Sequence, residues 1–448
     1  MVKTTRRAKT QSWAGMVQGS LSTADQQRIL DAVGNQLQNL GLEIVRDRKR
    51  LRTYALAEVT NTASQLGLAL SPEMTAVLTS RATALAGGLG FFDDLLPPNR
   101  DDLSEITLLP DGQLQVMYKG ARDFEPFEYQ PTLDETWRAV EALLAPIGRS
   151  VSEATPSVDA KLPRMAGMGG ARIKIIHPRL APGLGYPSIN IRLFEPKPVT
   201  LEQLAAWRVA PDRILDGLLR LVADGRRILI SGGTYTGKTT VLSAIAGGIP
   251  KTARIVKIED PEEIWLDHPH VVTLEARPSL PGSSVPAYLV KDGVDDALRM
   301  SPRWLIVGEV RTGDVAMALF RAQMSDHPGL TTFHATNPDH AVHRMALIMF
   351  ADQDIRFQAA KETFASAMDV IVQIGWLDER RQILGVWGVY DRLSGGDVKL
   401  EPFWMADGYK PDSDMSAEKI TSMCTTLISN GKADADQIRE LTQDGAHG

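Results

Sequence analysis

The stretch Ile230–Leu242, ISGGTYTGKTTVL, decides the fold of the second half of this chain. An apolar run leads into it, and the pattern G-x-x-x-x-G-K-[ST] is formed by Gly232, Gly237, Lys238 and Thr239. Glycines let successive backbone N–H groups turn toward one anion, and the helix that follows points its positive end at the same place. Strand, loop and helix together predict a binding site for a nucleoside triphosphate.

Every residue of this loop is a candidate nucleotide ligand: Gly232, Gly233, Thr234, Tyr235, Thr236, Gly237, Lys238, Thr239 and Thr240. We expect Lys238 to bind the β- and γ-phosphates and Thr239 to help hold Mg²⁺. Tyr235 stands where such loops usually carry a small residue. The outer arc of the loop accepts a side chain provided that its backbone does not demand a positive φ. We therefore expect negative φ at Tyr235 and a ring on the outer surface of the loop, packed or half exposed; the alternative is a ring that reaches the N-terminal domain or a neighbouring subunit.

Acidic and histidine residues follow the apolar runs downstream of the loop. RIVKIED ends in Glu259 and Asp260, RWLIVGE ends in Glu309, and LTTFH ends in His334. β-branched runs separated by helices predict a parallel sheet covered on both faces, whose strand ends line the ligand site. We therefore expect Lys238, Glu259 and Glu309 to be catalytic, with Thr239 and both glutamates near Mg²⁺. For each acid the alternative is a helix cap or a structural ion pair.

The first half of the chain has a different pattern of expected helices and strands. Helical spacing of apolar residues from Ser22 to about Leu85 predicts three helices, of which the second is expected over Thr53–Leu66, just after the basic run VRDRKRLR. The segment Ser104–Gly120 predicts a hairpin, and Leu133–Leu144 predicts a helix. The expected organisation is a flexible basic tail (1–20), a helical module (21–85), an α+β domain (86–195), a linker (196–204), an α/β domain (205–393) and a C-terminal hairpin and helix (394–448).

Composition excludes several classes of protein. A net charge of −6 and a pI of about 5.8 argue against wholesale nucleic-acid binding. The single cysteine, Cys424, excludes an intramolecular disulfide framework and fits a reducing compartment. No apolar run reaches the length of about 18 residues that a membrane span needs. We expect a cytoplasmic protein whose membrane contact, where present, is peripheral.

The order of four motifs resembles one protein family. GGTYTGKTT, IEDPEE, LIVGEVR and HPGLTTFHAT look like the Walker A motif, Asp box, Walker B motif and His box of the type II/IV secretion ATPase superfamily. The upstream segments PSVDAKLPRMAGMGGARIKIIHP and SINIRLFEP resemble the branch that holds Tad (Flp) pilus assembly ATPases and conjugative-transfer ATPases. The resemblance covers roughly residues 86–390. Gly308 in place of the Walker B aspartate is normal for this family, whereas Asp326, where a glycine usually precedes the histidine, and Tyr235 are less typical.

The resemblance implies a RecA-like ATPase domain in a homohexameric ring, with ATP and Mg²⁺ as ligands. In that superfamily N-terminal arginines reach the nucleotide phosphates, and by position the candidates here are Arg172 and Arg192. His334 would sense the γ-phosphate, and Arg311 would form an ion pair that orders the Walker B loop. The implied partner is an inner-membrane platform protein of a pilus or secretion machine, which places the chain at the cytoplasmic side of a bacterial inner membrane.

Two rival interpretations stay open from the sequence. A RecA-like core also serves nucleic-acid translocases, but the acidic pI and the lack of an evident basic, aromatic-lined strand count against direct nucleic-acid binding. A nucleotide-gated scaffold with little turnover is the second rival. The candidate catalytic set Lys238, Thr239, Glu259 and Glu309 argues for turnover, with Glu309 as the expected water-activating acid and Glu259 orienting water or metal.

Overall fold

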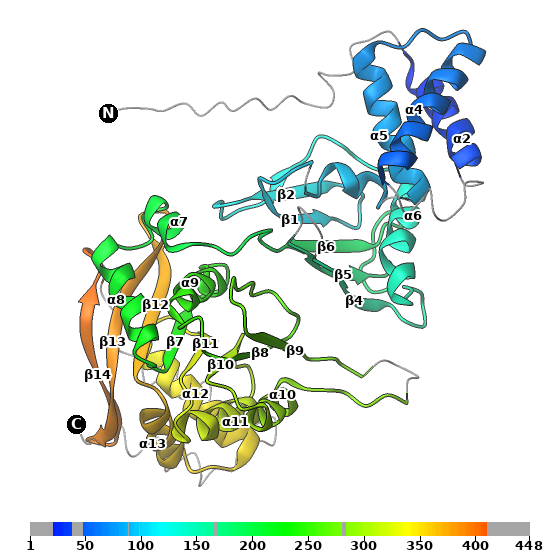
Figure 1. The fold of residues 1–448 in the computed structure, drawn as a ribbon. Helices are drawn as coiled ribbons and strands as arrows, with labels where there is room; N and C mark the ends of the chain where they lie inside the picture. Colours follow the sequence, from blue (N-terminus) through cyan, green and yellow to red (C-terminus); the bar gives the residue numbers. More distant parts are fainter. Residues whose placement is uncertain are drawn as a thin grey trace. The chain divides into compact units, whose positions relative to one another are not determined.

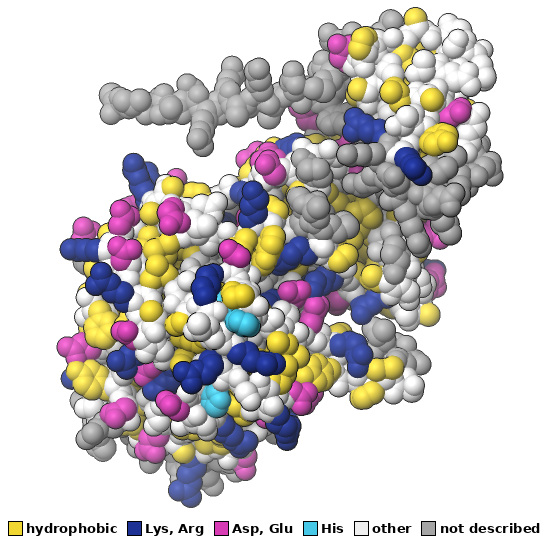
Figure 2. Space-filling view, in the orientation of Figure 1, with side chains coloured by type: hydrophobic (Ala, Val, Ile, Leu, Met, Phe, Trp, Pro, Cys, Tyr) yellow, Lys and Arg dark blue, Asp and Glu magenta, His cyan; other side chains and the backbone are white. Residues whose placement is uncertain are grey.

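The structure is a computed structural model, and it describes residues 21–37, 48–87, 89–97, 99–164, 169–279 and 284–409. The chain forms two compact units, Met1–Pro196 and Lys197–Gly448. The predicted basic tail and the predicted C-terminal helix around residues 420–428 lie outside the described residues. Over the face shown in Figure 2, Lys and Arg side chains are interspersed with Asp and Glu side chains. Every helix within the described ranges is too short or too polar to cross a lipid bilayer.

Three helices near the N-terminus pack around a small core of their own (Figure 1): α2 (Thr23–Leu37), α4 (Arg48–Gln65) and α5 (Pro72–Gly87). This confirms the predicted helical module. The second helix begins earlier than expected, at Arg48, because Leu51 is fully buried and starts the stripe that continues through Ala55 and Val59. The arginines on either side of Leu51 are exposed, so that part of the basic run is a solvated helix face.

The rest of the first unit is built on an antiparallel sheet with the strand order β3-β2-β1-β6-β5-β4. Helix α6 (Leu133–Leu144) packs on it, flanked by the short 3-10 helices η1 (Gly90–Asp94) and η2 (Ala145–Ile147). Polar and apolar residues alternate along β5 and β6, which buries one face of the sheet. The predicted hairpin and helix are confirmed. The strands are Leu103–Leu108 (β1), Leu114–Tyr118 (β2), Glu125–Pro126 (β3), Ser157–Leu162 (β4), Ala171–Ile176 (β5) and Ser188–Leu193 (β6).

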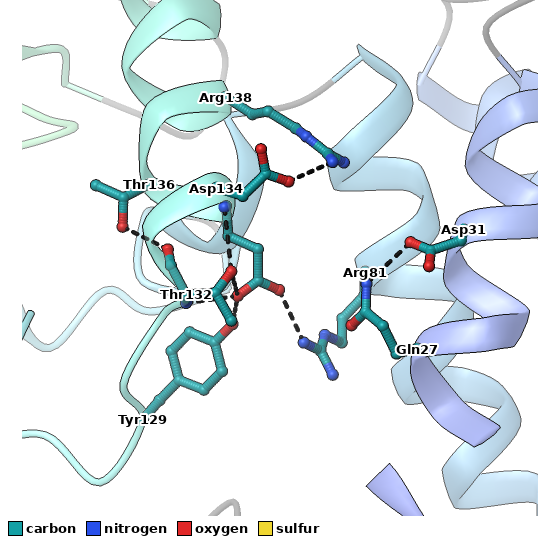
Figure 3. Close-up of polar contacts among 9 residues, drawn as sticks. Gln27, Asp31, Arg81, Tyr129, Thr132, Asp134, Thr136 and Arg138 are labelled. Carbon is teal, nitrogen blue, oxygen red and sulfur yellow. Dashed lines mark hydrogen bonds and ion pairs between the residues drawn. The ribbon is translucent and has the colours of Figure 1, made fainter. Parts of the chain in front are cut away.

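One carboxylate joins the helical module to this α+β part (Figure 3). Glu135 forms a capping box with Thr132 at the start of α6, and its Oε1 also lies 3.1 Å from Nη2 of Arg81 in α5. The hydroxyl of Tyr129 donates to the other oxygen of Glu135 at 3.2 Å. Burial and the charge of Glu135 raise the pKa of Tyr129 above its ordinary value. These contacts attach the helical module to the residues that cap α6.

The second unit contains an eight-stranded sheet with the order β14-β13-β12-β7-β11-β10-β8-β9. Strands from β12 to β9 in that order are parallel, and β13 and β14 pair antiparallel to the sheet at one edge. The strands are Ile228–Gly232 (β7), Ile255–Glu259 (β8), Val271–Glu275 (β9), Trp304–Val307 (β10), Gly329–His334 (β11), Val370–Leu377 (β12), Arg380–Ser394 (β13) and Asp397–Met405 (β14). Gly395 and Gly396 form the expected hairpin turn between the last two.

Helices cover both faces of this sheet, as predicted (Figure 1). One face packs against α7, α8 and α9, and the other against α10, α11, α12 and α13. This is a RecA-like α/β fold, and the expected fold class is confirmed. The helices are α7 (Leu201–Ala206), α8 (Asp212–Ala223), α9 (Lys238–Ile245), η3 (Ala246–Gly248), α10 (Val290–Ala297), η4 (Leu298–Met300), α11 (Gly313–Met324), α12 (Pro338–Gln353) and α13 (Phe357–Ala367).

Two features of this unit were not predicted. Strand β9 is an edge strand that stays half exposed, so it lacks the fully apolar signature of its neighbours. The last residues of the predicted linker 196–204 belong to α7, whose N-cap is Thr200 with a reciprocal bond from Gln203. The boundary between the two units lies just before them, at Pro196 and Lys197.

Candidate nucleotide site

The phosphate-binding loop follows β7 and ends at α9, the setting that its pattern predicts. A Cβ atom on Gly232 would lie 2.4 Å from the carbonyl oxygen of Ile374 in β12, so only glycine fits there. Gly237 has φ of 94° and is the N-cap of α9. The hydroxyl of Thr236 donates to the carbonyl of Gly233 at 2.9 Å and closes the loop on itself. Contacts within the chain itself therefore hold this loop in shape.

Tyr235 contradicts one expectation and meets another. Its φ is 60°, so the backbone does demand the left-handed conformation that we did not expect for a tyrosine. Its side chain is 43% exposed, in agreement with the expected half-exposed ring. Asp326, the second departure from the family pattern, also has a positive φ, of 67°. At both positions a residue other than glycine occupies a left-handed backbone conformation.

The strain at Tyr235 gives a testable difference between two substitutions. Tyr235→Gly is expected to be more stable than Tyr235→Ala by about 1 kcal/mol, because alanine keeps the Cβ atom that a positive φ disfavours. Chemical denaturation of both variants measures this difference in free energy of unfolding. Equal stabilities would contradict the left-handed backbone. Unchanged ATP affinity, turnover and ring assembly in Tyr235→Gly would exclude a functional contact of the ring.

The ends of the parallel strands bring the predicted side chains to one edge of the sheet. Lys238 follows β7, His334 ends β11, Glu309 follows β10, and Glu259 ends β8. In the sheet these strands are direct neighbours in the order β7-β11-β10-β8. The expectation that strand ends gather the candidate residues is confirmed for these four.

Three of these side chains form a continuous hydrogen-bonded line. Nζ of Lys238 lies 3.2 Å from Nδ1 of His334, and Nε2 of His334 lies 2.7 Å from Oε1 of Glu309. A lysine ammonium only donates, so Nδ1 accepts and the ring proton of His334 sits on Nε2, facing Glu309. Nζ of Lys238 also donates to the carbonyls of Gly232 and Gly233, at 3.2 Å and 2.8 Å. The phosphate-binding lysine is thus linked to the candidate catalytic acid through one imidazole.

Glu309 is kept ionised by its neighbours. Arg311 donates to its Oε2 at 2.6 Å, which confirms the expected ion pair. Burial raises the pKa of Glu309, but the hydrogen bond from His334 and the charge of Arg311 outweigh it and lower the pKa to about 2. The side chain remains 19% exposed. Glu309 is therefore a partly accessible carboxylate that stays charged at neutral pH.

Glu259 has a different environment, because it is only 3% exposed. Its Oε2 lies 2.8 Å from Nζ of Lys257, and its Oε1 accepts the backbone N–H groups of Glu263 and Ile264 at 3.0 Å and 2.8 Å. Burial raises the pKa of Glu259, and Lys257 opposes that shift. The structural ion pair that we kept as the alternative is therefore present, and the part expected for Glu259 in orienting water or metal stays a prediction.

Two arginines predicted to reach the nucleotide lie in the first unit, whereas the phosphate-binding loop lies in the second. Arg172 in β5 and Arg192 in β6 are paired across the strands. They lie 3.9 Å from Asp159 and 3.9 Å from Glu105, respectively, with side chains 43% and 44% exposed. Their contact with phosphate stays a prediction.

Sequence reasoning missed Lys257 and Arg344. Lys257 is the charged residue inside the run IVKI, two positions before Glu259, and alternate residues of a strand share a face. That spacing was the available signal for the pair. Arg344 in α12 donates to the carbonyl of His334, and its guanidinium lies 5.5 Å from the ring centroid of Phe333. Nothing in the spacing of Arg344 indicates that contact.

The site suits Mg²⁺ held mainly by substrate. Among the described residues no group of three or more His, Cys, Asp or Glu side chains is arranged to hold a metal. Mg²⁺ needs no such group, since it usually keeps several waters and is bound by one or two carboxylates together with substrate phosphates. Thr239 lies half-buried in the first turn of α9. Glu309 is the partly exposed carboxylate at the end of the hydrogen-bonded line from Lys238. These two residues fit the ion.

Comparisons with known proteins show what this chain is similar to. Residues 130–375 match the family described as "Type II/IV secretion system protein". A putative conjugal transfer protein of Mycobacterium tuberculosis is 30% identical over 271 residues, which are 60% of this chain and 76% of that protein. An uncharacterised protein of Methanocaldococcus jannaschii is 36% identical over 199 residues; the match covers 44% of this chain and only 34% of that relative. The Legionella pneumophila ATPase DotB has a TM-score of 0.48 at 20% identity, over 64% of this chain and 77% of DotB.

Proposed function

Because the chain belongs to the type II/IV secretion system protein family, we propose that it is an ATP-hydrolysing motor that works as a ring of six copies. The observation that carries this function is the hydrogen-bonded line from Lys238 through His334 to Glu309, at the sheet edge where the phosphate-binding loop ends. The line connects the group that holds the terminal phosphates with the group that faces the attacking water.

The loop and the start of α9 bind the triphosphate. Backbone N–H groups of the loop and the positive end of the helix face the phosphates, and Lys238 moves its ammonium from the carbonyls of Gly232 and Gly233 to the β- and γ-phosphates. Thr239 and Glu309 would hold Mg²⁺, and Glu259 is a further candidate. When bound, this ion neutralises the charge that develops on the phosphate oxygens.

Glu309 orients and activates the water that attacks the γ-phosphate in line. Its low pKa keeps it as an acceptor, and its remaining exposure leaves room for that water. When phosphate draws Lys238 away, Nδ1 of His334 is released, so His334 registers whether the γ-phosphate is present. Arg172 and Arg192 read the same phosphate from the N-terminal domain, and the change in domain angle drives the motor.

The partner of the ring is a platform protein in the bacterial inner membrane, to which the chain binds peripherally from the cytoplasm. The driven machine is a Tad-like type IV pilus, assembling or retracting, or a type IV secretion or conjugation channel. The matched family and the conjugal transfer relative support this group of machines. Pilin and platform genes beside the gene would favour the pilus, and mating-channel genes would favour conjugation.

An ATPase assay on the full chain tests the proposal. Mg²⁺-dependent hydrolysis is expected, with a rate per subunit that rises with protein concentration as the ring assembles. Assembled rings without turnover would favour the nucleotide-gated scaffold instead. Stimulation by single-stranded or duplex DNA would favour a nucleic-acid translocase; the interspersed charges on the face in Figure 2 support the opposite expectation.

A further inference from the structure

We propose that Lys257 is a positioning residue, which holds Glu259 and the loop after it against the backbone that carries Glu309. The inference rests on the proposed ATP hydrolysis, because it concerns the same site. It assigns a part to a buried lysine that neither the motifs nor the proposed mechanism uses. It also accounts for the hydrogen bonds that both oxygens of Glu259 accept from its own chain.

All three protons of the Lys257 ammonium have acceptors. Nζ lies 2.8 Å from Oε2 of Glu259, 2.9 Å from Oε1 of Glu262 and 2.7 Å from the carbonyl oxygen of Ile264. The side chain is 3% exposed, so the charge is out of contact with bulk water. A buried charge with this full set of acceptors is held firmly, since each acceptor compensates part of its lost hydration.

The same contacts wrap the loop around Glu259. Ile264 donates its N–H to Oε1 of Glu259 and accepts from Lys257 through its carbonyl, so one peptide segment is held from both sides. Glu263 adds a second N–H to Oε1. Both oxygens of the buried carboxylate are therefore occupied by the chain itself. In this conformation Glu259 organises the loop.

Glu259 in turn lies against the residue before Glu309. A Cβ atom on Gly308 would lie 3.0 Å from Cγ and 3.5 Å from Oε1 of Glu259, so the glutamate occupies the space that a side chain at position 308 would need. Gly308 also donates its N–H to the carbonyl of Ile258 at 2.9 Å. A shift of the Glu259 carboxylate therefore presses on the peptide from which Glu309 projects.

Two readouts distinguish positioning from direct chemistry. If Glu259 itself acts on water or metal, no substitution at position 257 can restore the kcat that is lost in Glu259→Gln. If it acts through the clamp of Lys257, Glu259 and Ile264, then removing both charges together restores much of what either single change destroys. The double variant leaves neither a buried carboxylate without its lysine nor a buried lysine that has lost one of its two carboxylates. The neutral pair Lys257→Met with Glu259→Gln keeps an oxygen for the two backbone N–H groups.

The experiment measures Mg²⁺-ATP hydrolysis and nucleotide-free thermal unfolding for the wild type, Lys257→Met, Glu259→Gln and the double variant. Each single variant is expected to lose roughly 10- to 100-fold in kcat with little change in KM, the size of effect seen when a supporting shell moves a reacting group. The double variant is expected to regain part of the lost kcat and of the lost unfolding midpoint. If Lys257→Met does not fold, the comparison of Glu259→Gln with the double variant decides.

Lys361 supplies a matched control. Its side chain is 8% exposed and its Nζ lies 2.6 Å from Asp397, beyond the end of β12 opposite to the site. Lys361→Met should lower the unfolding midpoint and leave kcat unchanged.

Wild-type kcat in Lys257→Met would overturn the inference, and so would a double variant no more active than Glu259→Gln. A wild type without turnover would instead count against the proposed function. In that case the nucleotide-free unfolding midpoints still test the clamp: recovery in the double variant supports it, and a Lys257→Met midpoint equal to the wild type contradicts it.

Discussion

Glu309→Gln is expected to stop ATP turnover and to leave ATP binding intact. The carboxylate has a pKa of about 2, accepts from His334 and Arg311, and keeps part of its surface exposed. A glutamine of the same shape cannot accept a proton from water at neutral pH, and loss of such a group typically costs about 10²- to 10⁴-fold in kcat. The assay is the initial rate of phosphate release at saturating Mg²⁺-ATP, with ATP affinity measured separately by calorimetry.

Glu362→Gln is the matched control for this substitution, because Glu362 is an exposed glutamate on α13 of the same unit. It should hydrolyse ATP at the wild-type rate. Normal turnover in Glu309→Gln would show that water is activated elsewhere, and Glu259 would then be the acid to test. Loss of ATP binding in Glu309→Gln would mean that the main part of this residue is to hold the Mg²⁺-nucleotide complex.

Lys238→Met is expected to remove most of the affinity for ATP. Lys238 is 7% exposed, and its ammonium already donates to two carbonyls of the phosphate-binding loop. A hydrogen bond to a charged group contributes about 1.5–3 kcal/mol, so the dissociation constant should rise by roughly 10- to 100-fold. Calorimetric titration with Mg²⁺-ATP measures this change directly.

Thermal unfolding separates this variant from Glu309→Gln. A ligand that binds only the folded state raises the unfolding midpoint, so ATP should stabilise Glu309→Gln and fail to stabilise Lys238→Met at the same concentration. Lys291→Met is the control, since Lys291 is an exposed lysine in α10. Equal stabilisation of Lys238→Met and the wild type by ATP would contradict the assignment of Lys238 as the main phosphate ligand.

Most of the confirmed predictions rest on residues that lie close together in the sequence. The loop from Gly232 to Thr239 is defined by neighbours in the chain, so its pattern was sufficient to locate it. The bounds of α6 follow from Thr132 and Glu135, two residues that cap the helix reciprocally within one turn. Glu309 and His334 were found because each terminates an apolar run, and parallel strands end at one edge of a sheet.

The missed features depend on contacts between segments that are distant in sequence or on backbone torsion. The line from Lys238 to His334 joins residues 96 positions apart, and strand order sets it rather than spacing. The pairing of Lys257 with Ile264 needs the turn after β8, which no periodicity describes. Tyr235 is a different case: a tyrosine usually indicates a negative φ, and here the fold of the loop overrides that preference.

The closeness of Gly232 to β12 limits what mutagenesis of the motif can reveal. Any side chain at position 232 would collide with the carbonyl of Ile374 at 2.4 Å and with the hydroxyl of Thr236 at 2.7 Å, both protein atoms that are present before any nucleotide arrives. An inactive Gly232→Ala protein would therefore report a disturbed junction between two strands and carry no information about phosphate affinity. In this chain the neighbouring strand β12 requires the first glycine of the motif. Loss of activity in a variant at position 232 is therefore weak evidence for a nucleotide contact.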